Sequence, residues 1–230
     1  MNIRFYILAT IAILCPVVCV ADFNPTAYYT VDGEAFETTD AISDAQAPLS
    51  VTFRANPSAI DDGVVPSYEW RFLKDGATDA YLTRYEENTS YEFTESGTTT
   101  VSLYVTYSGT GYDDNTQPEL VSTIIVSISS SILEMPNAFS PNGDGINDIY
   151  KAKSNHKSII SFKAYIFNRW GQKLYEWTDI DGGWDGTYHG SPVKAGVYYV
   201  LVKAKGADGI EYNIKRDVNL LRDYMENTEY

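Results

Sequence analysis

Apolar and polar residues alternate over many short segments of this chain. Such alternation places successive side chains on opposite faces of a β-strand. The pattern is clear at Leu49–Phe53, Tyr68–Phe72, Thr98–Tyr107 and Val121–Ile128. No long segment shows an apolar stripe at helical spacing with capping residues. We therefore predict an all-β protein.

Turn-forming residues separate the predicted strands. Glycine follows polar residues at Asp61–Gly63, Lys74–Gly76, Glu95–Gly97 and Ser108–Gly111, and each group is typical of a tight turn. Short strands at this spacing, in units of about 100 residues, are typical of immunoglobulin-like sandwiches. The 230-residue chain is long enough for two such domains in tandem.

The N-terminus has the pattern of a secretory signal peptide. Arg4 precedes an apolar run from Phe5 to Val18, and the small residue Ala21 ends the segment. This order predicts a signal peptide at residues 1–21, cleaved during export. A membrane anchor is the alternative, but the run is short and contains Pro16. We expect no transmembrane segment in the mature chain.

Both cysteines, Cys15 and Cys19, lie inside this segment. The chain from residue 22 onward therefore has no disulfide, thiol nucleophile or cysteine metal site. Acylation of one cysteine would make the protein a lipoprotein. Leu14 and Val18 disfavour that alternative, because a small residue is expected before the modified cysteine.

The charge distribution divides the mature chain. Residues 22–131 carry 18 acidic and 4 basic side chains, whereas residues 132–230 carry 13 acidic and 12 basic ones. Small polar residues at Ser129–Ser131 form a short linker, and Pro136 interrupts any continuing strand. We predict domains at 22–131 and 132–230 with limited hinge freedom. The acidic first domain excludes nucleic acid as an expected partner.

Three segments of the first domain carry a family resemblance. Ala47–Phe53, Tyr68–Phe72 and Gly97–Val105 resemble, in this order, the strands of the PKD family, over residues 27 to 131. The turn at Lys74–Gly76 departs from the family pattern. Trp70 alternates with Glu69 and Arg71, so we predict that it lies in the core between two sheets.

Four motifs follow one another in the second domain. They are Pro136–Asp148, Ile166–Gly171, Gly183–Gly186 and Ala195–Tyr199. The third predicts a loop in which Asp185 binds backbone amides, and the fourth predicts a strand entered through a bend at Gly196.

The first motif has two interpretations. Its oxygen-bearing residues alternate in the manner of an EF-hand loop, which makes calcium a candidate cofactor; the candidate ligands are Ser140, Asn142, Asp144, Ile146 and Asp148. The twelfth position is Lys151, so the bidentate carboxylate is missing, and Asn147 or Asp185 would have to complete the site. The alternative is a set of turns whose side chains bond their own backbone, with no cofactor required.

The second motif belongs to a predicted β-hairpin, in which residues 163–167 form the first strand and residues 168–177 follow it. Phe162, Ala164 and Ile166 would share one face of its first strand, and Asn168 and Gly171 would form the turn. Trp170 lies at the tip. We expect it to cap the end of the sandwich, and an exposed recognition ring is the alternative.

Together these motifs resemble the gliding motility-associated C-terminal domain, the type B sorting domain of the type IX secretion system, from Leu133 to Arg222. The resemblance implies recognition by the outer-membrane secretion machinery of a Bacteroidetes bacterium, and delivery to the cell surface or outside the cell. Its last strand departs at Asp217, where the family has glycine, and Asp223–Tyr230 overhangs the usual end. The sorting-motif residues it implies are Pro136, Asn137, Phe139, Pro141, Asn142, Gly143, Asp144, Gly145, Asn147, Asp148, Phe167, Asn168, Arg169, Trp170, Gly171, Trp184, Asp185, Gly186, Gly196, Val197 and Tyr198.

The sequence shows no catalytic constellation. Its histidines, His156 and His189, lie in no nucleophile or metal motif, so we expect no enzyme activity. The first domain is then a structural spacer or cargo. The alternative is an adhesin that binds a glycan or host protein, assisted by calcium, through exposed tyrosines; these are Tyr28, Tyr29, Tyr81, Tyr85, Tyr104 and Tyr107.

Overall fold

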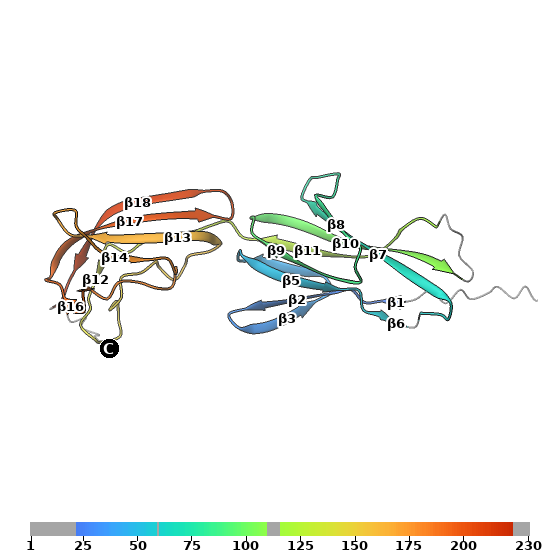
Figure 1. Ribbon diagram of the computed structural model, residues 1–230, viewed down its shortest axis with the longest axis horizontal. Coiled ribbons are helices and arrows are strands. Elements are labelled where there is room, and N and C mark those ends of the chain that lie inside the picture. Colours follow the sequence, from blue (N-terminus) through green and yellow to red (C-terminus); the bar gives the residue numbers. More distant parts are fainter. Residues whose placement is uncertain (1–21, 59, 110–115, 223–230) are drawn as a thin grey trace, which may run out of the picture.

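Every regular element of the described chain is a β-strand. The computed structural model describes residues 22–58, 60–109 and 116–222, and its two groups of sheets follow each other end to end (Figure 1). This confirms the all-β prediction. Nowhere in these ranges is there a helix with the length and hydropathy needed to cross a bilayer. The expected signal peptide, with both cysteines, and the overhang at 223–230 lie outside the described residues.

The first domain is a sandwich of a five-stranded and a four-stranded sheet. The larger sheet has the order β4-β11-β10-β7-β8, with β4 parallel to β11 and the other pairs antiparallel. Its strands are β4 (Ala41–Ala45), β7 (Val64–Lys74), β8 (Leu82–Arg84), β10 (Gly97–Gly109) and β11 (Glu119–Ile128). The smaller sheet, β3-β2-β5-β9, is antiparallel. It comprises β2 (Thr26–Val31), β3 (Glu34–Thr38), β5 (Leu49–Arg54) and β9 (Asn88–Phe93), while β1 (Asp22–Phe23) pairs with β6 (Pro57–Ser58).

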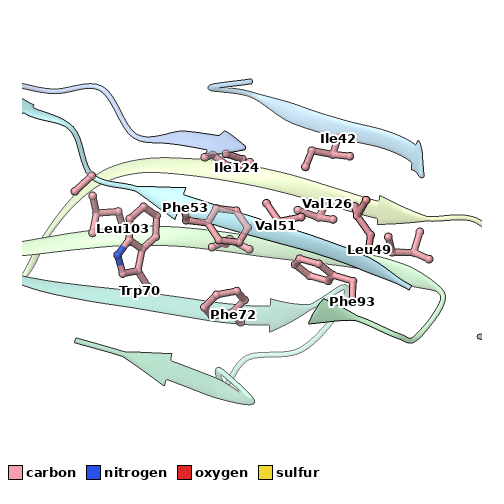
Figure 2. Close-up of a cluster of buried hydrophobic side chains, with 14 of the residues drawn as sticks. Ile42, Leu49, Val51, Phe53, Trp70, Phe72, Phe93, Leu103, Ile124 and Val126 are labelled. Atoms are coloured by element: carbon pink, nitrogen blue, oxygen red, sulfur yellow. The ribbon is translucent and has the colours of Figure 1, made fainter. Parts of the chain in front are cut away.

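Trp70 lies between these sheets, as its alternation predicted. Its side chain is fully buried, and its ring centroid is 5.8 Å from that of Phe53 (Figure 2). The indole Nε1 donates to the carbonyl oxygen of Glu86 at 3.1 Å, so the polar edge of the ring is satisfied. Phe72, two residues along the same strand, is also buried and contacts Phe53. Alternate residues of β7 therefore build the core.

The second domain has one regular five-stranded sheet. Its order is β12-β18-β17-β13-β14, with a separate β15-β16 pair. The strands are β12 (Ala138–Phe139), β13 (Ile159–Phe167), β14 (Lys173–Trp177), β15 (Thr187–Tyr188), β16 (Ser191–Pro192), β17 (Gly196–Gly206) and β18 (Glu211–Leu220). β18 continues through Asp217, and Val218 and Leu220 are fully buried, as the period-2 pattern predicted.

Extended segments rather than a second regular sheet cover the inner face of this sheet. Phe162, Ala164 and Ile166 of β13 point into the core, as predicted. Opposite them lie apolar residues of the loops, joined by isolated backbone bridges between Ile132 and Lys157 and between Tyr150 and Trp184. The domain thus keeps two layers. The second layer, formed by these loop segments, is held by individual contacts instead of a continuous ladder of backbone hydrogen bonds.

Serine hydroxyls connect the two domains. Ser131 donates its backbone N–H and its hydroxyl to the carboxylate of Asp208, at 2.8 and 2.7 Å. Ser129 donates to the carbonyl of Ala45 and lies 2.9 Å from the hydroxyl of Ser158. Ala207 completes the junction by packing against the core of the first domain. A linker held in this way agrees with limited hinge freedom.

Candidate functional site

Strand pairing brings the first, second and fourth motifs of the second domain to one end of its sheet. Phe139 of β12 pairs with Leu220, and Leu220 pairs with Gly196 at the start of β17. Phe167, the last residue of β13, pairs with Tyr199 of the same β17. We call this end, which points away from the first domain, the distal end (Figure 1).

Trp184 is the centre of the distal end. It is fully buried, and its ring centroid lies 5.3 Å from that of Phe139 and 5.1 Å from that of Tyr198. Its Nε1 donates to the carbonyl of Thr187 at 2.8 Å, and its backbone forms a two-way bridge with Tyr150. One ring thus joins the first, third and fourth motifs.

The loop after Trp184 is fixed by two side chains. Asp185 accepts hydrogen bonds from the backbone N–H and hydroxyl of Thr187, at 2.9 and 2.8 Å, which confirms the predicted role of this carboxylate. Arg222 donates to the carbonyls of Gly186 at 2.7 Å and Val193 at 2.9 Å. Gly186 has φ +76°, and a side chain there would approach Pro141. Arg222 was not among the predicted site residues, although it ends the stretch that carries the family resemblance.

Tyr198 is held at the start of β17 by a hydrogen bond to the preceding loop. Its hydroxyl donates to the carbonyl of Lys194 at 2.7 Å. Burial raises the pKa of Tyr198, while the positive charges of Arg222 and Arg169 act in the opposite direction. Gly196, with φ +144°, provides the predicted bend before this strand.

The start of the first motif is tied to the sheet. The carbonyl of Pro136 accepts a hydrogen bond from the hydroxyl of Tyr150 at 3.0 Å. The carbonyl of Asn137 accepts one from the backbone of Asn219, which continues the ladder of β12. Phe139 is buried against Trp184.

Asp148 organises the turn that follows. One carboxylate oxygen accepts the backbone N–H groups of Asn142 and Gly143, at 2.9 and 2.7 Å, and the other accepts that of Gly145 at 2.8 Å. Gly143 and Gly145 both have φ +84°, and Asn147 has φ +53°. These are left-handed conformations that glycine and asparagine adopt most readily.

Two of the other candidate calcium ligands, Asn142 and Asp144, are engaged in the same way. Asp144 accepts the backbone N–H of Ile146 at 2.8 Å, and Asn142 accepts that of Asp144 at 3.1 Å. The backbone N–H of Ser140 donates to Asn147. The loop thus has the bonding that the backbone-turn interpretation predicts. Among the described residues, no group of three or more His, Cys, Asp or Glu side chains is placed to hold a metal. Calcium binding by the loop's oxygens stays a prediction.

The turn around Asp148 should respond to acid. Hydrogen bonds from Gly143, Gly145 and Asn142 hold the pKa of Asp148 below its ordinary value, although burial acts in the opposite direction. A lowered pKa in the folded state means that the carboxylate stabilises the turn above its ordinary pKa of about 3.9. This stabilisation should be lost as the pH falls through the lower, folded-state pKa.

Amide NMR shifts measured against pH test this prediction. The N–H signals of Gly143 and Gly145 should titrate together with a midpoint below about pH 3.9. Asp148→Asn should abolish the transition, whereas Asp185→Asn should leave it unchanged. A midpoint at or above the ordinary value would contradict the bonding described.

The structure of the hairpin tip shows that the position predicted for Trp170 is wrong. The predicted hairpin forms, because β13 pairs with β14 and the N–H of Gly171 donates to the carbonyl of Asn168. Trp170, however, is 81% exposed and does not cap the sandwich. Asn168 Oδ1 accepts the backbone N–H groups of Trp170 and Gln172, at 3.0 and 3.1 Å. This turn directs the ring into solvent, where the guanidinium of Arg169 lies 5.4 Å from its centroid.

Other apolar side chains are exposed near the tip. Val197 and Tyr199 point outward from β17 and are 45% and 48% exposed. Tyr199 pairs with Phe167, the residue directly before the turn. The distal end therefore presents several exposed apolar side chains, together with Arg169, on a framework fixed by hydrogen bonds. Such patches are typical of protein contact sites.

The six candidate tyrosines of the first domain do not form one exposed face. Tyr107 is buried, at 5% exposure, and Tyr85 is 71% exposed. The guanidinium of Arg71 covers the ring of Tyr104 at 4.0 Å. The remaining rings, Tyr28, Tyr29 and Tyr81, lie against Arg54, Phe36 and Tyr91 respectively. Rings that are partly buried and interleaved with charges are what the spacer interpretation predicts.

Comparison with known proteins agrees with the motif-based expectation for the second domain. Residues 133–214 match the family model of the CHU_C type IX secretion signal domain. No curated protein matches the chain. Among solved structures, a crystal structure of the FN1–FN3 domains of chicken CNTN1 is 10% identical; the match covers 83% of this chain and 68% of that chain, with a TM-score of 0.26.

Proposed function

We propose that the protein is a non-catalytic exported protein that the type IX secretion system delivers to the cell surface or the extracellular space. The observation that carries this proposal is the match of residues 133–214 to a type IX secretion signal domain. The match indicates a sorting signal and implies export. The source would then be a Bacteroidetes bacterium, and the signal peptide at residues 1–21 would direct the first membrane crossing.

The distal end is the surface we assign to the secretion machinery. The machinery must recognise features that the folded domain displays, and buried motif residues such as Trp184 and Phe139 cannot be contacted directly. Trp170, Arg169 and Tyr199 are displayed there on a hydrogen-bonded turn and strand. Buried aromatic motif residues would build the framework, and the exposed ones would make the contact.

The first domain then serves as a spacer or minimal cargo. Its tyrosines are partly buried or covered by arginine, and its junction with the sorting domain is held by serine and aspartate hydrogen bonds. These contacts suit a rigid extension. We expect no catalytic activity and no required cofactor. Turnover of a candidate substrate by the purified protein would contradict the first expectation.

A reporter fusion tests whether the second domain is sufficient for delivery. An unrelated periplasmic protein carrying a signal peptide and residues 132–230 should become accessible to external protease in a host with the secretion system. The same reporter with residues 22–131 is the matched control and should stay protected. Equal protection of both fusions would contradict the proposal.

A further inference from the structure

A cleft lies at the junction of the two domains, far from the distal end. Its volume is about 730 Å³, within the range of roughly 300–1,000 Å³ that is usual for small-molecule sites. One wall comes from the first domain and comprises the β2–β3 hairpin, β4 with the segment that follows it, and the start of β5. The other wall consists of residues 151–159 together with Ile180 and Asp181 of the second domain. Neither domain alone forms this cleft.

The first wall is aromatic. Tyr29 and Phe36 pair directly across β2 and β3, and their rings stack with centroids 5.6 Å apart and planes 23° apart. Tyr29 packs against the core, which holds the pair in place, but Phe36 is 43% exposed and Val31 is 41% exposed. The hairpin points toward the second domain (Figure 1), so these apolar groups line the cleft.

The second wall and the rim are polar. Asp181 lies 3.1 Å from the Nε2 atom of His156, and the two residues line the cleft with Ser154 and Lys151. On the first-domain side, Asp44 forms an ion pair with Lys157 at 3.0 Å. The site therefore offers carboxylate, hydroxyl, imidazole and ammonium groups opposite the aromatic first wall.

The charges of the lining disfavour an anionic ligand. Asp44 and Asp181 already have basic neighbours, and Asp32 and Lys151 bring one charge of each sign to the lining. The lining thus carries a small excess of negative charge, so an anion would be repelled by the cleft itself and by the acidic first domain. A ligand with an apolar face and many hydroxyl groups matches both walls. We propose that this cleft binds a neutral oligosaccharide.

This inference does not depend on the export proposal, because binding is measured on purified protein. Isothermal titration calorimetry of the chain from residue 22 onward, with both domains, should detect binding to at least one member of a neutral panel. The panel comprises gluco-, xylo-, manno-, malto- and chito-hexaoses at millimolar concentration. Sulfated and uronic acid oligosaccharides of the same length should bind more weakly.

Variants on each wall locate the site. Phe36→Ala removes an exposed aromatic contact and should weaken binding by about tenfold. Asp181→Ala, in the other domain, should weaken it measurably because it removes a hydrogen-bond acceptor. Tyr85→Ala removes a ring that is 71% exposed and does not line the cleft, so it is the matched control and should bind as the parent does.

Three results would overturn the inference. They are no binding to any neutral oligosaccharide, a preference for the anionic ones, or binding that Phe36→Ala and Asp181→Ala leave unchanged. Thermal unfolding of each variant checks that any weaker binding does not reflect a disrupted fold.

Discussion

Removal of residues 133–230 should leave the first domain in the periplasm instead of at the cell surface. The truncated chain keeps the signal peptide predicted at residues 1–21, so it should still cross the inner membrane. It loses the region that matches the sorting domain, and with it the distal end. We expect surface accessibility to fall to background, measured by external protease treatment and cell fractionation.

The truncated protein should remain folded, which makes the experiment interpretable. Both sheets of the first domain and Trp70 at their centre lie within residues 22–128. The truncation also removes Ala207, a small side chain that packs against the edge of this core from the second domain. A cooperative melting transition of purified residues 22–132 is the control. Normal surface display of the folded truncation would refute the sorting proposal.

The alternation of apolar and polar residues was sufficient to predict several of the strands. Thr98–Tyr107 lies within β10, and the inward face of β13 was assigned correctly from Phe162 to Ile166. Alternation reports local geometry, and a pleated strand has only two faces. The same reasoning correctly placed Trp70 in the core.

Contacts between distant segments were not predictable in this way. The bond between Ser131 and Asp208, and the cleft lined by Phe36 and Asp181, join residues that are far apart in the sequence. The irregular layer of the second domain has no period, since its buried residues are fixed by individual contacts such as that of Tyr150 with Trp184. Only the folded chain shows these contacts between distant segments.

The direction of a side chain at a turn was equally inaccessible. The sequence places Trp170 at the hairpin tip, but a tip residue can fold back or point outward. Asn168 decides between these outcomes by accepting the N–H groups of Trp170 and Gln172. The sequence identified the residues of the turn, but not the orientation that the turn imposes on the Trp170 ring.

The two tryptophans of the sorting motifs should therefore behave in opposite ways. Trp184→Ala empties a fully buried site between Phe139 and Tyr198 and leaves the carbonyl of Thr187 without its indole donor. Replacement of a buried aromatic residue by alanine costs about 3–5 kcal/mol, so a large part of the domain's stability should be lost. Trp170→Ala changes an exposed side chain, and the free energy of unfolding should change by less than about 0.5 kcal/mol.

Measuring export beside stability should distinguish a lost contact with the secretion machinery from a loss of folding. If Trp170 contacts the secretion machinery, Trp170→Ala should reduce surface delivery while the melting temperature of the domain stays unchanged. Tyr175→Ala, in the adjacent strand β14, is the control, because it removes a ring that is 37% exposed and belongs to none of the four motifs. Denaturant unfolding and surface proteolysis measure the two properties in parallel. Full delivery of Trp170→Ala would show that the ring makes no essential contact, whereas a large loss of stability would show that it has a structural role despite its exposure.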